Sequence, residues 1–125
     1  HLVRATLEAS AFGVRDVVDV MVNEADVSLP RLTVDGGAAA NNFLCQTQAD
    51  QIRVPVVRSE ILETTGLGAA FLAGIGTGFW PNKEELAKTW RSDRTFEPKE
   101  RDEQAHRRWR VAVERTKNWA TSVSK

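Results

Sequence analysis

The sequence predicts an α/β fold that is rich in helix and whose sheet is incomplete. Two short alternating segments indicate strands at 29–35 and 53–58, whereas several longer segments have the spacing of helices. Two strands are barely stable as an isolated sheet. The helices expected at 2–24 and 65–77 carry more apolar surface than these strands can cover. We therefore expect the chain to be one part of a longer protein.

The predicted elements follow one another in a regular order. Apolar residues three and four positions apart predict the helix over 2–24, and Gly36 and Gly37 end the strand that follows it. A further helix is expected to begin directly after the glycines and to end near Asp50. Pro55 either places the second strand at a sheet edge or marks the start of that strand.

Helices dominate the second half of the chain. Thr64 and Thr65 are candidate N-caps for a helix of small and apolar residues, and Asn82 is expected to cap a short polar helix. Residues 91–100 are expected to form a connecting loop. Residues 101–120 are expected to form a basic amphipathic helix, because tryptophans and small apolar residues share one of its faces.

Composition limits the classes of protein to which the chain can belong. Basic and acidic side chains each number 17, so net charge gives no case for a nucleic-acid or membrane partner. The charges are uneven, since residues 1–80 are acidic overall and residues 81–125 are basic. The single cysteine, Cys45, cannot form an internal disulfide, is expected to be a buried structural thiol, and suits a reducing cytoplasm. Without a run of about 18 apolar residues, no membrane span is expected.

The most informative segment joins a strand to a helix through two glycines, in the sequence VDGGAAANN at 34–42. A strand, a glycine turn and a helix start together point free backbone N–H groups at an anion. Gly36 and Gly37 would let the backbone approach a phosphate or an adenine, and Asn41 offers an amide to a base or ribose. A plain capped turn also fits this pattern, because no phosphate-loop or dinucleotide-binding motif accompanies it.

Other polar residues are weaker candidates for chemistry. Asp16 and Asp19 lie three apart on the first helix, as do Glu60 and Glu63 before a later one. A solvated helix face or a first-turn partner of the helix dipole explains each pair better than a shared metal or proton. His106 lies among basic residues and is expected to face solvent. With two histidines and one cysteine in the chain, no metal site is expected.

Three blocks resemble the FGGY family of carbohydrate kinases, and within that family the glycerol kinases. HLVRATLE (1–8) resembles the second half of the family's C-terminal signature, whose first half would lie upstream. The stretch from VDGG to NNFL (34–44) resembles the adenosine-binding segment. ETTGLGAA (63–70), followed by GFW (78–80), resembles the glycerol-kinase version more than the xylulose- or gluconate-kinase versions. The likeness is weakest after about residue 91.

The resemblance implies an actin-like, ribonuclease H-like ATPase fold of two α/β domains, with ATP in the cleft between them. Residues 1–90 would be the C-terminal part of the second, nucleotide-binding domain. Residues 91–125 would be a loop and a basic amphipathic helix of the same domain. By the matching motif positions, the backbone of Gly37 would lie near the nucleotide phosphates, Asn41 would contact the adenosine, and Gly36 would shape the turn.

The implied reaction transfers the γ-phosphoryl group of MgATP to a terminal hydroxyl of glycerol, giving glycerol 3-phosphate. The catalytic base and the glycerol-binding side chains would come from upstream, so no catalytic residue is assigned here and the chain alone is expected to be inactive. The resemblance implies ATP and Mg²⁺ as cofactors, the N-terminal remainder of the same chain as a partner, and a homo-oligomer. The glycine-rich helix at 65–77 would pack closely under the nucleotide loop.

Three alternatives to a glycerol kinase remain open from the sequence. The first is another polyol or sugar kinase of the same family, since the residues that choose the acceptor would lie upstream. The second is a catalytically dead relative that keeps the nucleotide loop. The third is an interaction module whose basic helix at 101–120 binds an acidic partner.

Overall fold

The computed structural model describes residues 1–118 of the 125-residue chain, so the end of the helix predicted at 101–120 lies outside the described part. None of the described helices has the length and apolar character that crossing a membrane requires. The elements in chain order are α1 (Leu2–Ala25), β1 (Leu32–Val34), the 3-10 helix η1 (Gly37–Ala40), α2 (Asn42–Ile52), β2 (Val56–Ser59), α3 (Thr64–Gly76), α4 (Lys83–Ala87), β3 (Ser92–Phe96) and α5 (Glu103–Thr116).

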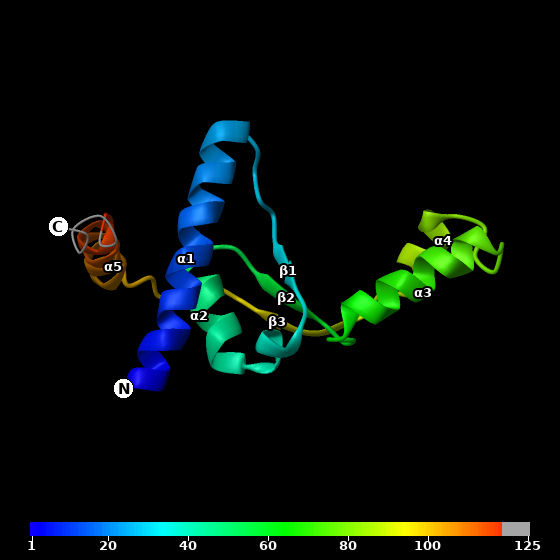
Figure 1. Ribbon diagram of the computed structural model, residues 1–125, viewed down its shortest axis with the longest axis horizontal. Coiled ribbons are helices and arrows are strands. Elements are labelled where there is room, and N and C mark those ends of the chain that lie inside the picture. The colour runs from blue at the N-terminus through cyan, green and yellow to red at the C-terminus, as the bar shows by residue number, and fades with distance from the viewer. Residues whose placement is uncertain (119–125) are drawn as a thin grey trace.

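A three-stranded sheet lies at the centre of the described chain (Figure 1). β2 is the middle strand, parallel to β1 and antiparallel to β3. Pro55 precedes β2, and its carbonyl oxygen accepts a hydrogen bond from the N–H of Leu32 at 2.9 Å. The proline therefore marks the start of a central strand, which was one of the two arrangements that the sequence allowed.

Both predicted strands are present, but β3 forms within residues 91–100, so the prediction of a connecting loop there was wrong. Four of its five residues are exposed and only Phe96 is buried, which leaves almost no apolar alternation to reveal a strand. Pairing with β2 imposes the extended conformation, with Val56 opposite Phe96 and Val57 opposite Thr95. Tertiary pairing thus decides the structure of a segment whose own sequence is typical of a loop.

The hydrophobic core lies between the sheet and α2, and its buried residues are Ala39, Cys45, Ala49, Val56 and Phe96. Cys45 is 1% exposed, and its Sγ donates to the carbonyl oxygen of Ala39 at 3.2 Å. Burial raises the pKa of this thiol. The prediction of a buried structural thiol is therefore confirmed, because a protonated, enclosed cysteine is a poor nucleophile.

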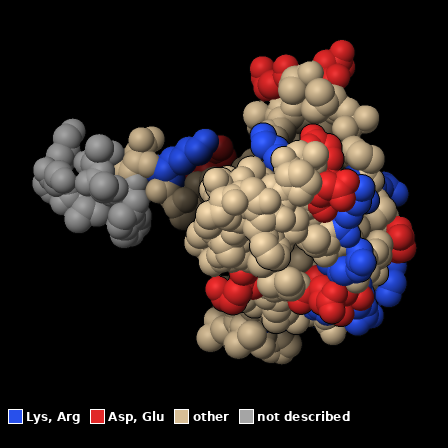
Figure 2. All heavy atoms as spheres, turned by 90° about the vertical axis from the view of Figure 1, so that its right-hand side faces the viewer, with Lys and Arg blue, Asp and Glu red and all other residues tan. Residues whose placement is uncertain are grey.

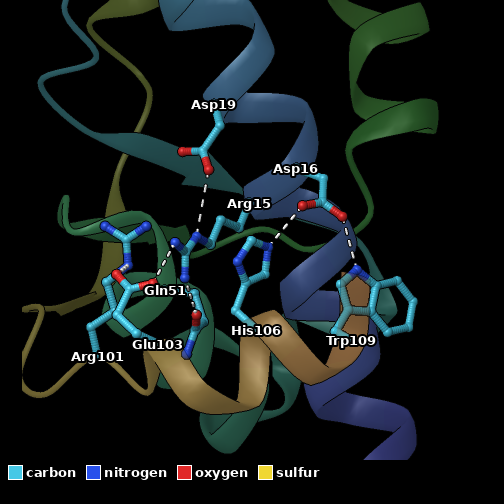
Figure 3. Close-up of polar contacts among 8 residues, drawn as sticks. All are labelled: Arg15, Asp16, Asp19, Gln51, Arg101, Glu103, His106 and Trp109. Carbon is cyan, nitrogen blue, oxygen red and sulfur yellow. Dashed lines mark hydrogen bonds and ion pairs between the residues drawn. The ribbon is translucent and has the colours of Figure 1, made fainter. Parts of the chain in front are cut away.

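α1 contacts both α2 and α5, and a buried arginine joins the three helices (Figure 3). The side chain of Arg15 donates from Nη1 to Oε1 of Gln51 on α2 at 3.1 Å. From Nη2 it donates to Oε2 of Glu103 on α5 at 2.9 Å. Arg15 is 6% exposed, and these bonds, with an ion pair from its Nε to Oδ2 of Asp19 at 3.5 Å, offset the cost of burying its charge.

Asp16 and His106 meet at the contact between α1 and α5, which corrects two predictions. Nε2 of His106 lies 2.8 Å from Oδ1 of Asp16, and Nε1 of Trp109 donates to Oδ2 at 2.8 Å (Figure 3). His106 is 4% exposed and not solvent-facing, and Asp16 is not simply solvated. Partial burial alone would raise the pKa of Asp16, but the bonds from Trp109 and His106 hold that pKa below its ordinary value.

α3 and α4 extend away from the sheet (Figure 1). The expectation that α3 packs under the glycine turn was wrong, since no described atom lies within 4 Å of a Cβ built on Gly66 or Gly68. At Gly74 the neighbour is the ring of Trp80, which folds back onto the helix. α3 begins after Glu63, so its N-cap is one residue earlier than the nearer of the two predicted caps.

Candidate functional site

The turn between β1 and α2, residues 35–42, is the candidate site. Gly36 has φ 81° and ψ 169°, a conformation that residues with a Cβ adopt only under strain. Its N–H donates to the carbonyl oxygen of Leu62 at 2.9 Å. The backbone therefore needs glycine at this position, and the turn is tied to the segment that precedes α3.

Gly37 opens η1 and is exposed. A Cβ built on Gly37 would meet no described atom within 4 Å apart from its immediate chain neighbours, so the space beside its backbone is open. The first N–H groups of a helical turn have no acceptor inside that turn. Gly37 and Ala38 are both exposed, so an external acceptor can reach this part of the turn.

Asn41 separates η1 from α2, so the single helix expected after the glycines is in fact two. Its backbone is extended, at φ −82° and ψ 106°, and its N–H donates to the carbonyl oxygen of Ala38 at 3.1 Å. The side-chain Oδ1 accepts from the N–H of Leu44 at 3.1 Å and thereby caps α2. The side-chain amide nitrogen has no hydrogen bond to any described residue, so capping leaves a donor for a ligand.

Arg58, the third residue of β2, contacts the same turn from the sheet, and it was not singled out in the sequence. Its Nη1 donates to the carbonyl oxygens of Ala39 at 3.1 Å and Ala40 at 3.3 Å. Nη1 also donates to Oδ1 of Asn42 at 2.8 Å. Nε donates to Oδ2 of Asp93 on β3 at 2.6 Å. One guanidinium thus links the turn to two strands.

A signal for Arg58 was nevertheless present in the sequence. Residues two apart on a strand share a face, and Val56 on that face is fully buried. The side chain of Arg58 is accordingly only 12% exposed, and its Cζ lies 5.4 Å from the ring centroid of Phe96. An arginine that continues the buried face of a strand requires specific partners, and that requirement could have identified it.

More than half of the chain matches a known protein family. Residues 1–77 match the model of the FGGY family of carbohydrate kinases, C-terminal domain. The chain belongs to the FGGY family. The resemblance seen in the sequence is therefore confirmed, and the match includes the whole of the glycine turn.

Relatives of this FGGY chain include bacterial glycerol kinases. The glycerol kinase of Caldanaerobacter subterraneus is 51% identical over 123 residues, which are 96% of this chain and 25% of that protein. The glycerol kinase of Xanthomonas campestris is 49% identical over 125 residues, 98% of this chain and 25% of that protein. The chain thus spans about a quarter of the length of these relatives.

Solved structures of FGGY kinases share the fold. Plasmodium falciparum glycerol kinase with ADP has a TM-score of 0.73 and 32% identity, covering 94% of this chain and 24% of that one. A ligand-bound xylulose kinase from Lactobacillus acidophilus has a TM-score of 0.73 and 20% identity, and the match covers 97% of this chain and 25% of that one. At this identity the similarity shows the fold alone. Both have the actin-like ATPase fold, which confirms the predicted fold class.

Proposed function

We propose that this FGGY chain supplies part of the adenosine and phosphate site of an ATP-dependent glycerol kinase. The observation that carries the proposal is the turn itself, in which Gly36 has a glycine-specific conformation and Gly37 borders open space. The turn lies in the segment that matches the family. Relatives named glycerol kinase, and a structural neighbour solved with ADP, support glycerol as acceptor and ATP as phosphoryl donor.

Each residue of the turn has its own proposed role. The N–H of Gly37 would donate to a phosphate oxygen, because no Cβ obstructs its approach. Gly36 would set the direction of the backbone. The side-chain amide nitrogen of Asn41 would donate to the adenosine while its oxygen continues to cap α2. Fixed donors of this kind suit phosphoryl transfer, in which a protein acts mainly by positioning and by charge stabilisation.

The catalytic base and the glycerol-binding groups are proposed to lie outside this chain. Within residues 1–118, no cluster of three or more histidine, cysteine or acidic side chains could hold a metal ion. Mg²⁺ would neutralise charge on the nucleotide phosphates, and it usually takes only one or two carboxylates from the protein. We propose that any protein ligands of the Mg²⁺ come from segments outside this chain.

The uncharged surface of α3 is proposed to contact the rest of a longer chain. Seen from the α3 and α4 end, the molecule shows a broad area without charged side chains (Figure 2). Leu72 and Phe79 are 74% and 76% exposed. Phe71 and Trp90 help to line a cavity of 940 Å³, whose other lining residues include some from α3, α4 and the sheet. Apolar areas of this kind mark contact surfaces, and the greater length of the relatives provides a partner segment.

The organisation of the chain is also a proposal. Residues 1–90 would form the main body and residues 91–125 the C-terminal end of one nucleotide-binding domain. The pairing of β3 with β2 supports a single domain, because it joins the two parts through one sheet. The family resemblance suggests a homo-oligomer that functions in the cytoplasm.

A coupled ADP-release assay on the full-length protein tests the proposed function. Glycerol, a pentulose and gluconate are offered in turn with MgATP, and residues 1–125 alone serve as the control. We expect ADP release that depends on glycerol, and none from the isolated segment. ADP release with another polyol or sugar but not with glycerol would show that glycerol is not the acceptor. A full-length protein that binds no nucleotide would overturn the proposal.

A further inference from the structure

We propose that Arg58 is a positioning residue for the glycine turn, and that Asp93 on β3 holds its guanidinium in place. The inference rests on the proposed nucleotide function of the turn. It extends that function to a part of the chain that the family match does not cover, since β3 lies beyond residue 77. The strand that was mistaken for a loop would then help to set the geometry of the nucleotide site.

The carbonyl end of η1 is where Arg58 acts. The last carbonyl groups of a helical turn have no partner within it, and a cation is favourable at this end. Nη1 of Arg58 supplies both a donor and a charge, at 3.1 Å from the oxygen of Ala39 and 3.3 Å from that of Ala40. Holding this end of a four-residue helix also fixes its opposite end, where the amide of Gly37 lies.

The residues on both sides of Asn41 bond to the same nitrogen atom of Arg58. Ala40 precedes Asn41 and accepts from Arg58 through its carbonyl oxygen, while Asn42 follows and accepts through its side-chain Oδ1 at 2.8 Å. Asn41 itself caps α2 through its own side-chain oxygen. Arg58 therefore helps to fix the position from which the side-chain amide of Asn41 would reach a ligand.

Asp93 and the sheet fix the Arg58 side chain. Nε of Arg58 donates to Oδ2 of Asp93 at 2.6 Å, and the guanidinium lies over the ring of Phe96. Asp93 lies between the paired residues Arg94 and Ser92 of β3, at the irregularity where the register between β2 and β3 shifts. The planar guanidinium can serve several acceptors at once in a fixed geometry, which a lysine ammonium on a flexible stem cannot reproduce.

Nucleotide affinity of the full-length protein separates positioning from plain stabilisation. The variants are Arg58→Gln, Arg58→Lys and Asp93→Asn, with Arg94→Gln as the matched control. Arg94 is exposed, lies on the neighbouring strand and covers the same Phe96 ring at 4.9 Å, yet it has no contact with the turn among the described residues. The measurements are Kd for ADP by calorimetry, KM for ATP and for glycerol, and Tm.

We expect Arg58→Gln to weaken ADP binding and to raise KM for ATP by about tenfold or more, as loss of charged hydrogen bonds predicts. KM for glycerol should stay unchanged. Arg58→Lys and Asp93→Asn should give intermediate losses, and Arg94→Gln should match the wild type. If Arg58→Gln does not fold, Arg58→Lys and Asp93→Asn provide the test: KM for ATP should rise in both while KM for glycerol stays unchanged.

Two results would overturn the inference. In the first, the wild type binds ADP and the folded Arg58 and Asp93 variants bind it equally well. In the second, Tm falls while KM for ATP and KM for glycerol change together, which indicates a structural role only. A wild-type protein that binds no ADP would instead overturn the proposed function, and this inference with it.

Discussion

Gly36 and Gly37 are neighbours, but glycine matters at each for a different physical reason. At Gly36 the backbone has φ 81°, so an added Cβ would be strained by the conformation itself. At Gly37 a Cβ would meet no described atom within 4 Å, so the protein has room for it. What that Cβ would obstruct is the approach of a phosphate to the exposed amide.

Alanine substitutions in the full-length protein should separate these two effects. Gly36→Ala should lower the free energy of unfolding by about 1–3 kcal/mol, the usual cost of a strained backbone. Gly37→Ala should change it by less than about 0.5 kcal/mol yet weaken ADP binding severalfold. Urea unfolding and calorimetric titration with ADP measure the two quantities. Equal losses of stability in the two variants would contradict this distinction.

The glycine pair could be predicted from the sequence, whereas the Asp16–His106 contact could not. A strand that ends at two glycines before a helix restricts the local geometry strongly, so the turn was evident. Asp16 and His106 lie 90 positions apart, and their contact depends on α5 packing against α1. The three-residue spacing of Asp16 and Asp19 reports only that they share a helix face.

α5 packs against α1 through both polar and aromatic contacts. Its aromatic contacts to Phe12 of α1 are modest, with ring centroids 5.9 Å away at His106 and 6.1 Å away at Trp109. Asp16 receives bonds from the same two residues (Figure 3). Neutralising Asp16 should therefore loosen α5 specifically.

Asp16 should make the stability of the contact between α1 and α5 depend on pH. Because its folded-state pKa lies below the ordinary value, its contribution is fully present above about pH 4 and is lost as pH falls through the folded pKa. The Tm of Asp16→Asn should lie below that of the wild type at about pH 5, and the difference should shrink toward about pH 3. Thermal melts of the full-length protein over this range test the expectation. A Tm difference that stays constant down to about pH 3 would contradict it.

α3 carries glycines that look alike in the sequence but differ in their surroundings. A Cβ on Gly74 would overlap Cε3 and Cζ3 of Trp80, while a Cβ on the exposed Gly66 would meet no other part of the described chain within 4 Å. Spacing alone could not distinguish the two, because the difference arises when the chain at 79–80 folds back onto the carbonyl oxygen of Gly74.

Substituting alanine at each glycine of this pair should have opposite effects. Gly74→Ala should destabilise by about 1–3 kcal/mol, since the ring of Trp80 must move to relieve the overlap. Gly66→Ala should be neutral or stabilise by up to about 1 kcal/mol through helix propensity. Urea unfolding of the full-length variants measures both values, and tryptophan fluorescence should change only for Gly74→Ala. Equal destabilisation by Gly66→Ala and Gly74→Ala would contradict this distinction between the two glycines.

At the scale of the whole molecule, the incomplete sheet was predictable from the sequence. Apolar residues in the helices exceed what the strands can cover, and the structure accordingly leaves Leu72 and Phe79 exposed. Which surfaces stay uncovered was not predictable, because this depends on α3 extending away from the sheet (Figure 1). The third strand was missed for a related reason, since pairing with β2 determines its conformation.

Hydrogen exchange of the full-length protein, with and without ADP, tests most directly whether this segment supplies part of the nucleotide site. Peptides that cover residues 34–44 report on the glycine turn, and peptides from α5 serve as the internal control. We expect ADP to slow exchange in the turn, most clearly at Gly37 and Ala38, and to leave α5 unchanged. ADP binding that protects other regions while the turn exchanges at its free rate would contradict the central claim.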